Sequence, residues 1–553
     1  MILGELLMPT LNWIGKEKVI NHHMDVPFRI LEHTYGFSNG EQTREETKSG
    51  NKIIHGDNLE ALKALLPEYE GRIKCIYIDP PYNTGNEGWV YNDNVNDPRI
   101  KKWLQNVVGK EGEDLSRHDK WLCMIYPRLK LLHKLLSEDG IILVSIDDFE
   151  FSNIKLLLDE IFGGKGFFAN FVWRRRVSSS MAASWISKDH EYIVSYSKNP
   201  DVVFVRGEER DMDKYNIPDE NGRYYASMPL TVGMTKEMRP NQWYALKHPK
   251  TGTTYWPPNN RVWGYYPPTM GVKIAANLII FPEDFPDKKL TTPRLKSYPE
   301  DAKRERKPLS TWIFEQNQEI DTLEVTTLKT AKNEEGTRVL KSIFSDSVFS
   351  YAKPLSLIES LIGQFTKDDD IILDSFAGSG TTAHSVLSLN KRDNGKRKFI
   401  LVEMENYVDV ITAERVKGVI KGYGEGAKKV EGTGGSFDFY KLGESLFMEN
   451  GELNESVGVD KIRQYLYYTE TKTSLTETKH KDTKHFLGKY TDTGYYFNYK
   501  HGEVTTLDHA FLATMKTKAE QYVVYADNCL LTKEFMTKHH IIFKKIPRDL
   551  ARF

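Results

Sequence analysis

The sequence feature that most constrains the fold is a regular alternation of short apolar runs with amphipathic segments. The apolar runs are rich in β-branched residues and cover 53–55, 73–79, 140–146, 168–174, 190–196, 370–374 and 398–403. Nearly continuous runs of this kind are typical of strands that are covered on both faces. Segments with a helical period lie between them, as at 58–66, 117–137 and 382–391. The alternation predicts an α/β fold with an open, doubly wound, mostly parallel sheet of seven strands.

An interruption of this alternation divides the chain into parts. Residues 200–345 are rich in Pro, Tyr, Trp and basic residues and lack the βα rhythm, which predicts an inserted, substrate-facing domain. The remaining parts follow from composition and pattern. We expect an N-terminal arm (1–50), two halves of the sheet domain (51–199 and 346–421), a glycine-rich linker with a following segment (422–445) and a small α+β C-terminal domain (446–553).

The composition excludes several classes of protein. With 39% hydrophobic and 12% aromatic residues among 553, the chain is neither disordered nor fibrous. No stretch reaches about 18 apolar residues, so no membrane-spanning helix is expected, and the first residues do not form a signal peptide. Cys75, Cys123 and Cys529 lie too far apart in sequence to indicate disulfides or a zinc site. We expect a cytoplasmic protein without a bound metal.

Charge limits any contact with nucleic acid to a local patch, because 76 Lys and Arg residues stand against 77 Asp and Glu residues. One candidate patch is the segment 288–307, and another follows the strand at 168–174. Charge runs are more often solvated faces, so neither patch indicates DNA by itself. The candidate DNA-contacting residues are Arg174, Arg175, Arg176, Lys288, Lys289, Arg294 and Lys296.

A tetrapeptide at the end of the strand at 73–79 carries the first chemical signal. Asp79-Pro80-Pro81-Tyr82 lies where doubly wound sheets bind ligands, outside the carboxyl ends of the strands. The prolines fix the backbone and lack N–H donors, which leaves carbonyl groups to accept hydrogen bonds. An aspartate, a proline carbonyl and an aromatic ring suit a planar ring that carries an exocyclic amine. The alternative is a rigid turn without a ligand.

A glycine loop after the strand at 370–374 carries the second signal. Its glycines allow a ligand to approach the backbone, and the helix that follows presents free N–H groups to an anion. Glu403 ends the next strand, where an acid is suited to pair with two ribose hydroxyls. No Lys follows Gly380, so the phosphate loop of nucleoside triphosphatases is absent and a helicase is excluded. The loop residues that indicate a nucleoside cofactor are Asp374, Phe376, Gly378, Gly380 and Thr381.

A third segment, His55-Gly56-Asp57-Asn58, follows a strand and opens a helix. Asp57 by itself is best interpreted as an ordinary N-cap. Its place just upstream of the strand that carries Asp79 shifts the balance towards a contact with the cofactor.

Together these motifs resemble the amino-directed DNA methyltransferases that use S-adenosylmethionine. They are most similar to the modification subunits of Type III restriction–modification systems. Asp79-Pro80-Pro81-Tyr82 resembles the catalytic motif of that family, and the segment from Asp374 to Gly380 resembles its cofactor loop. The catalytic motif precedes a long insert and the cofactor loop, which is the circularly permuted order of the β group. The resemblance covers about residues 20–445 and implies that the insert is a target-recognition domain.

The resemblance also implies a reaction and a set of site residues. The reaction is transfer of a methyl group from S-adenosylmethionine to the N6 amine of an adenine that is flipped out of double-stranded DNA. Asp57 would contact the cofactor adenine, and Lys353 belongs to the segment that precedes the cofactor loop. The implied catalytic residues are Asp79, Pro80, Pro81 and Tyr82. The implied cofactor-binding residues are Asp57, Lys353, Asp374, Phe376, Gly378, Gly380, Thr381 and Glu403.

Other functions stay open at this point. Methylation of cytosine at N4 uses the same geometry, although that group usually has Ser at the position of Asp79. A catalytically silent DNA-specificity subunit is a second alternative. A nuclease in the C-terminal domain would have Glu520 and Asp527 near Lys533 as its candidates. Methylation of cytosine at C5 is excluded, because no cysteine follows a proline.

The expected partners follow from the same resemblance. Double-stranded DNA is the substrate, and a separate restriction subunit is a candidate partner. A homodimer is expected because related proteins read asymmetric sites with two protomers. The predicted helix at 462–468 offers an apolar face for that contact.

Overall fold

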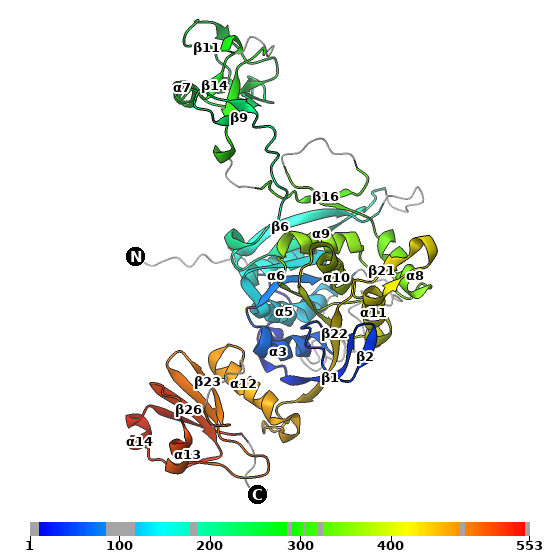
Figure 1. The fold of residues 1–553 in the computed structure, drawn as a ribbon, viewed down its shortest axis with the longest axis vertical. Helices are drawn as coiled ribbons and strands as arrows, with labels where there is room; N and C mark the ends of the chain where they lie inside the picture. Colours follow the sequence, from blue (N-terminus) through cyan, green and yellow to red (C-terminus); the bar gives the residue numbers. More distant parts are fainter. Residues whose placement is uncertain are drawn as a thin grey trace. The chain divides into compact units, whose positions relative to one another are not determined.

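The computed structural model describes residues 10–83, 117–176, 185–284, 290–301, 306–318, 325–475 and 482–547. The chain forms two compact units (Figure 1). The smaller unit comprises residues 207–308 and 323–326, and the larger unit comprises the rest of the chain. Among the described residues, no helix has the length and the apolar character needed to cross a membrane.

The larger unit is built on one sheet that contains all seven predicted strands. In their spatial order these are β6 (Phe167–Arg174), β7 (His190–Tyr196), β5 (Leu136–Ile146), β4 (Ile73–Ile78), β18 (Ile371–Asp374), β19 (Lys398–Glu403) and β3 (Lys52–His55). The strands from β5 to β3 run parallel, whereas β7 is antiparallel to both of its neighbours. The central sheet is therefore mixed, with a parallel middle.

Helices cover both faces of this sheet, as the predicted doubly wound fold requires. One face packs against α3 (Asn58–Tyr69), α5 (Arg117–Leu135) and α6 (Phe151–Phe162). The other packs against α9 (Leu355–Phe365), α10 (Thr381–Asp393) and α11 (Glu414–Lys421). The side chains of β4 alternate between the two cores: Ile76 and Ile78 enter the first, and Cys75 and Tyr77 enter the second. Burial on both faces explains why these strands are apolar throughout.

The connections diverge between β4 and β18, which are neighbouring parallel strands. From β4 the chain reaches β5 through α5 on one face, whereas from β18 it reaches β19 through α10 on the other face. A crevice forms where neighbouring connections leave in opposite directions, and ligands of open α/β sheets bind there. Both predicted motifs follow these two strands, so the fold brings them to one crevice.

The sheet extends beyond the seven predicted strands, into residues of the predicted arm, linker and insert. On one side it continues through β22 (Ser436–Ser445), β1 (Arg29–Ser38) and β2 (Glu41–Thr43), so much of the expected arm and linker belongs to the sheet. The reason is aromatic burial, since Phe437 and Phe439 enter the second core and Tyr35 stacks on Phe439 with ring centroids 4.9 Å apart.

On the other side the sheet gains β16 (Trp312–Glu315) and β17 (Lys329–Thr330). β16 pairs parallel with β6, which gives residues 309–322 to the larger unit. The helix α8 (Glu334–Phe344) belongs to that unit as well. The smaller unit therefore ends at residue 308, apart from residues 323–326, whereas the predicted insert extends to residue 345.

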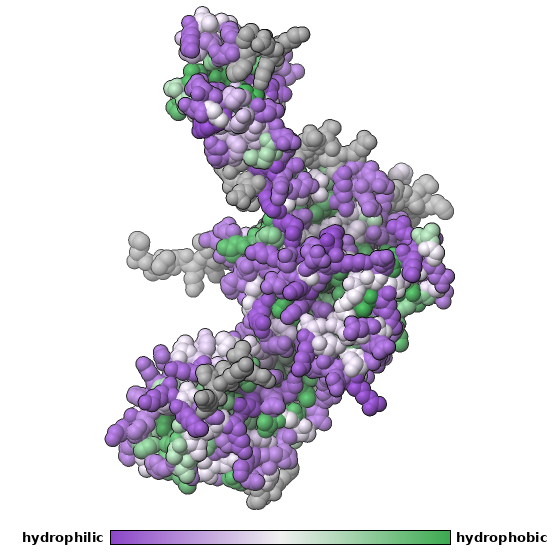
Figure 2. Space-filling model, in the orientation of Figure 1, coloured by the Kyte–Doolittle hydropathy of each residue, from purple (hydrophilic) through white to green (hydrophobic). Residues whose placement is uncertain are grey.

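The smaller unit consists of short strands and one longer helix around its own core. Its largest sheet has the order β14 (Ile279–Ile280), β15 (Arg294–Ser297), β9 (Tyr224–Pro229) and β8 (Ile217–Pro218). The helix α7 (Pro267–Ala275) contributes Met270 to a core with Trp263 and Phe281. Its visible surface is mainly hydrophilic (Figure 2).

The C-terminal segment forms a small sheet of β23 (Phe486–Tyr490), β24 (Thr493–Phe497), β26 (Gln521–Ala526) and β28 (Ile541–Lys545). The helices α12 (Val459–Thr471), α13 (His509–Thr514) and α14 (Lys533–Lys538) accompany it. The apolar face of α12 is covered within the chain, because Ile462 and Leu466 are buried and Tyr468 hydrogen-bonds to Glu70, the residue that follows α3. The face expected to support a dimer is therefore already used in folding.

Candidate active site

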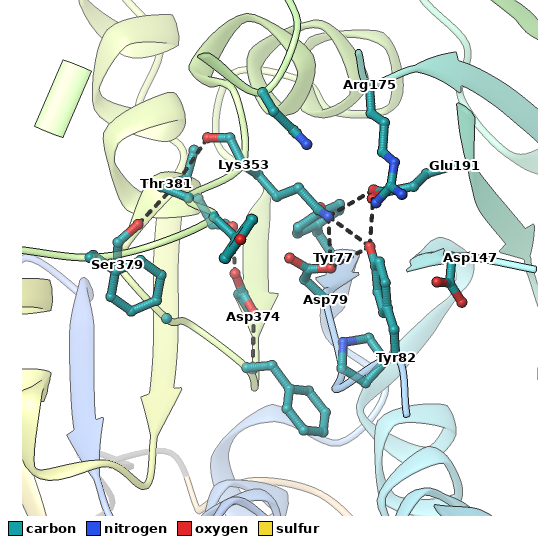
Figure 3. A pocket seen from close by; sticks show the side chains of 18 of the residues that line it. Tyr77, Asp79, Tyr82, Asp147, Arg175, Glu191, Lys353, Asp374, Ser379 and Thr381 are labelled. Carbon is teal, nitrogen blue, oxygen red and sulfur yellow. Dashed lines mark hydrogen bonds and ion pairs between the residues drawn. The ribbon is translucent and has the colours of Figure 1, made fainter. Parts of the chain in front are cut away.

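A pocket of about 660 Å³ opens at the crevice between β4 and β18 (Figure 3). Both predicted motifs line it. Of the predicted site residues, its lining includes Asp79, Pro80, Tyr82, Lys353, Asp374, Phe376, Gly378 and Thr381. The volume lies within the usual range for small-molecule sites, about 300–1,000 Å³.

The catalytic motif follows β4 directly. The Tyr82 hydroxyl donates to Oδ1 of Asp79 at 2.7 Å, and both side chains face the same cavity. Pro81 lies behind them, where its carbonyl accepts from Nε1 of buried Trp121 at 2.6 Å. This bond anchors the rigid turn to α5, so the motif is held in place from the core side.

Lys353 joins the two motifs. Its Nζ lies 3.2 Å from Oδ1 of Asp79 and donates to the Tyr82 hydroxyl at 2.7 Å, while its own carbonyl accepts from the Thr381 hydroxyl at 3.4 Å. Nζ also lies 4.8 Å from the centroid of the Tyr82 ring. The side chain therefore serves the catalytic motif, and the backbone meets the cofactor loop.

Glu191 of β7 completes this cluster, and the sequence reasoning missed it. Its carboxylate accepts from Nζ of Lys353 at 2.9 Å and from Nη1 of Arg175 at 2.8 Å. Only 4% of its side chain is exposed. A Glu inside a run predicted to be buried on both faces was the available signal, because a buried charge needs a partner.

The cluster balances two cations against two carboxylates. Burial alone would lower the pKa of Lys353, but Asp79 and Glu191 raise it above its usual value. Burial raises the pKa of Asp79, although Lys353 opposes this effect. Burial also acts to raise the pKa of Glu191, but Lys353 and Arg175 bring it below its usual value. Lys353 and Glu191 are therefore charged at neutral pH.

The glycine loop is shaped by two buried acids. Asp374 accepts from the Phe376 N–H at 3.0 Å and from the Thr382 hydroxyl at 2.6 Å. Glu403 accepts from the N–H groups of Gly378 at 2.8 Å and Glu405 at 3.0 Å. Burial raises the pKa of each acid to about 7.

Gly380 is required by the conformation of this loop. Its φ of 80° lies in the left-handed region that favours glycine. A Cβ at this position would lie 3.1 Å from Cγ2 of Thr412. The backbone can therefore run close beneath the pocket only with glycine here.

Asp57 and Glu403 do not line this pocket. Asp57 caps α3, where its side chain accepts from the N–H groups of Leu59 at 2.9 Å and Glu60 at 3.1 Å. Of the two interpretations of Asp57, the structure shows the N-cap. Contacts of Asp57 with the cofactor adenine and of Glu403 with the ribose stay predictions.

Comparison with known proteins identifies this arrangement. Residues 73–414 match the family described as DNA methylase, and this match includes both motifs and the inserted domain. The chain belongs to the DNA methylase family. The predicted family is thereby confirmed.

Relatives of this methylase include the StyLTI Mod subunit, a Type III restriction–modification protein of Salmonella typhimurium. It is 32% identical over 67% of this chain and 57% of its own length. The EcoP15I Mod subunit of Escherichia coli is 31% identical over 72% of this chain and 64% of its own length. The Type II methyltransferase M.KpnI of Klebsiella pneumoniae is 32% identical over 64% of this chain and 81% of its own. The methylase thus spans less than two thirds of either Mod subunit.

The solved structure of the PvuII cytosine-N4-specific DNA methyltransferase aligns with 66% of this chain, and the alignment includes 86% of the PvuII chain. The identity is 13% and the TM-score is 0.31. A likeness at this level carries no conclusion about the methylase.

The predicted DNA-contacting residues of the methylase that the structure describes belong to both units. Arg175 and Arg176 line the pocket, whereas Arg174 pairs with Glu315 at 2.6 Å. In the smaller unit, Arg294 donates to Ser227, and Lys296 is 9% exposed beside the ring of Tyr225. Lys288 and Lys289 lie outside the described residues. Because only 9% of Lys296 is exposed, this residue offers little surface to a phosphate.

The two remaining chemical candidates concern metals and a nuclease. No group of His, Cys, Asp and Glu in the described parts of the methylase has a metal-binding arrangement. Asp527 is 1% exposed and accepts from the N–H and the hydroxyl of Thr505. Its position is that of a structural residue of the C-terminal sheet.

Proposed function

We propose that this methylase is a site-specific DNA methyltransferase that methylates the N6 amine of a flipped-out adenine and takes the methyl group from S-adenosylmethionine. The observation that carries the proposal is the pocket itself, in which Asp79 and Tyr82 lie opposite the glycine loop. One pocket with an amine acceptor at one end and a nucleoside-type loop at the other suits transfer between two ligands.

The residues of the chain supply positioning and electrostatics. S-adenosylmethionine, when bound, provides a methyl group on a sulfonium leaving group. The lone pair of an aromatic amine is delocalised into its ring. We infer that Asp79 and the Pro80 carbonyl accept the two N–H groups of the amine and so direct its lone pair out of the ring plane. Tyr82 would stack on the base.

Lys353 now occupies the surfaces that this proposal assigns to the base. Its ammonium lies 3.2 Å from Oδ1 of Asp79, as an amine N–H would, and 4.8 Å from the centre of the Tyr82 ring. An entering base would replace Lys353 at Asp79. Glu191 is in place to keep the lysine within the pocket, because it accepts from Nζ at 2.9 Å.

The loop fits the proposed cofactor. Gly378 and Gly380 have positive φ angles, of 51° and 80°, which keep the backbone close to the pocket, and α10 begins directly behind them at Thr381. Phe376 lines the pocket and offers an aromatic surface to the cofactor. In this proposal, Asp374 and Glu403 hold the loop in shape through its N–H groups.

The smaller unit is proposed to be the target-recognition domain, because it interrupts the sheet between the two motifs and has its own core. Double-stranded DNA is the proposed substrate, with Arg175 and Arg176 at the pocket as candidate contacts to the phosphates beside the flipped base. The likeness to Mod subunits supports a restriction–modification system with a separate restriction subunit as partner. A homodimer remains part of the proposal, without a role for α12.

The decisive experiment identifies the methylated base. The protein is incubated with bacterial DNA that lacks methylated bases and with S-adenosylmethionine carrying a labelled methyl group, and the nucleosides are separated by mass spectrometry. We expect N6-methyladenine. Label in N4-methylcytosine would replace the proposed substrate, and no label in DNA would favour a silent specificity subunit. Asp79→Ala is the control for contaminating activity.

A further inference from the structure

A fully buried arginine lies beneath the cofactor loop. Arg415 belongs to α11 and is 0% exposed. Its Nη1 donates to Oγ of Ser379 at 2.9 Å and to Oγ1 of Thr381 at 2.8 Å, and Nη2 lies 3.4 Å from Nδ1 of His384. Nη1 also donates to the Ser379 carbonyl at 3.4 Å. All of these partners are neutral: the hydroxyls and the carbonyl carry no charge, and burial and the charge of Arg415 keep the pKa of His384 well below its usual value.

The charge of Arg415 has no counter-ion among the described residues. Glu335 raises the pKa of Arg415 electrostatically, but its carboxylate is hydrogen-bonded to Ser356 and forms no salt bridge with Arg415. The buried Nε of Arg415 has no hydrogen-bond partner. Burial lowers the pKa of Arg415 to about 10, so the guanidinium stays charged at neutral pH. An unpaired buried charge strongly destabilises a fold unless a ligand or partner supplies the opposite charge.

The partners of Arg415 open into the pocket. Ser379 and Thr381 both line it, and Thr381 is the first residue of α10, a helix of 13 residues whose first N–H groups point out of its N-terminal end. Their hydroxyl oxygens accept from Arg415. The Thr381 hydroxyl donates to the Lys353 carbonyl, so Ser379 is the hydroxyl of this pair that can donate to an anion. The buried cation, the Ser379 hydroxyl and the helix N-terminus thus make this end of the pocket favourable for an anion.

A rare backbone feature places the arginine there. A π-helical turn at Asp409–Ala413 precedes α11, and its Thr412 hydroxyl donates to the Gly378 carbonyl at 2.6 Å. Such turns are uncommon and occur frequently at functional sites. The turn fastens α11 to the glycine loop, so that Arg415 and the loop form one rigid support.

We propose that Arg415 is a positioning residue that provides the counter-charge for the carboxylate of the cofactor's amino-acid end, through Ser379 and Thr381. The inference rests on the proposed function, in which S-adenosylmethionine is the cofactor. In Figure 3 Ser379 and Thr381 lie at the opposite side of the view from Tyr82. A carboxylate held there leaves the rest of the cofactor to extend towards Asp79.

The test compares two ligands that differ by one carboxylate. Binding of S-adenosylmethionine and of its decarboxylated form is measured by titration calorimetry for the full chain and for Arg415→Met. We expect the variant to bind S-adenosylmethionine roughly ten- to a hundredfold more weakly, the effect of losing a charged hydrogen-bonding partner. Binding of the decarboxylated form should change much less. Lys421→Met, which removes an exposed cation at the end of the same helix, is the matched control.

The outcomes separate this inference from the function on which it rests. If Arg415→Met weakens both ligands equally, or neither, the proposed pairing with the carboxylate is wrong. If the unaltered chain binds neither ligand, the proposed cofactor is wrong. If Arg415→Met does not fold, the pair Ser379→Ala with Thr381→Val replaces it, and the same selective loss is required. Arg415→Lys should recover part of the preference for the carboxylate.

Discussion

At the scale of single residues, the site depends on shared hydrogen bonds more than on any one side chain. Asp79 receives hydrogens from Tyr82 and Lys353, and Lys353 also binds Glu191. A substitution at one of these positions leaves the others buried with an altered balance of charge. Loss of chemistry and loss of stability must therefore be measured separately.

Asp79→Ala removes the proposed acceptor for the target amine. We expect methyl transfer to slow by about 10²–10³-fold, the usual effect of losing one preorganised hydrogen-bonding group. Affinity for S-adenosylmethionine should change little, because the loop is held by Asp374 and Glu403. Single-turnover transfer and calorimetry test this pair of results. Near-normal turnover with lost cofactor binding would exchange the roles of the two motifs.

Glu191 and Lys353 should be coupled in stability. Glu191→Gln leaves Lys353 and Arg175 with one carboxylate fewer, and Lys353→Met leaves two carboxylates with one cation fewer. Each change should destabilise the fold, and the double variant should lose less than the sum, by about 0.5–3 kcal/mol. Urea unfolding of the four proteins measures this energy. Strict additivity would show that the pair acts independently.

At the scale of elements, the connection from β18 to α10 is built around buried acids that form no salt bridge with any residue the structure describes. Both Asp374 and Glu403 accept N–H groups of the loop, and burial raises the pKa of each to about 7. In an unfolded chain these groups titrate near pH 4. The folded state therefore holds more protons than the unfolded state between about pH 4 and pH 7.

It follows that stability contributed by these acids is present at low pH and is lost as the pH rises towards 7. We expect the free energy of unfolding of Glu403→Gln to fall less steeply over this range than that of the unaltered protein. The difference in slope should be at most about 1.4 kcal/mol per pH unit. Denaturant titrations across this pH range provide the measurement, with exposed Glu425→Gln as the control. Parallel slopes would contradict the assignment.

The predicted DNA-contacting residues differ in exposure according to the element that carries them. Arg176 lines the pocket, whereas Lys296 of β15 is 9% exposed beside Tyr225. We expect Arg176→Ala to reduce the salt dependence of DNA binding by about one phosphate contact and Lys296→Ala to leave it unchanged. Filter binding at several salt concentrations tests this. Exposed Lys165→Ala serves as a charge-matched control.

At the scale of the whole molecule, two compact units divide the work that the proposal assigns to one protein. The smaller unit has its own core, and the strands of the sheet pair without it. Its two ends lie side by side, since the Lys307 N–H donates to the Glu208 carbonyl at 2.9 Å. A short linker should therefore be able to replace it.

Replacement of residues 207–308 by a short Gly/Ser linker should leave a folded protein that still binds S-adenosylmethionine. We expect selectivity among DNA sequences to be lost, because the proposed target-recognition domain is gone. Calorimetry and sequencing of methylated positions test the two halves of this expectation. Retained selectivity would place base recognition in the larger unit.

Much of the architecture was accessible from the sequence, because it depends on neighbours along the chain. The apolar runs predicted the seven central strands of the 12-stranded sheet, and the motifs were correctly assigned to the ends of β4 and β18. The N-cap role of Asp57 was one of the two interpretations of its place before α3, and its predicted contact with the cofactor stays a prediction. Period, capping and turn chemistry are local properties, so a single sequence carries them.

Only the tertiary structure decided which distant segments meet. The pairing of β1 with β22 joins strands about 400 residues apart, and it depends on aromatic burial that no local period encodes. Glu191 and Lys353 are 162 residues apart, and Arg415 meets Ser379 from another helix. A charge in a sequence does not specify its partner, since ion pairs and buried hydrogen bonds form only after the sheet has set the geometry. The sequence thus determined the strands and the motifs, and folding determined the electrostatic network between them.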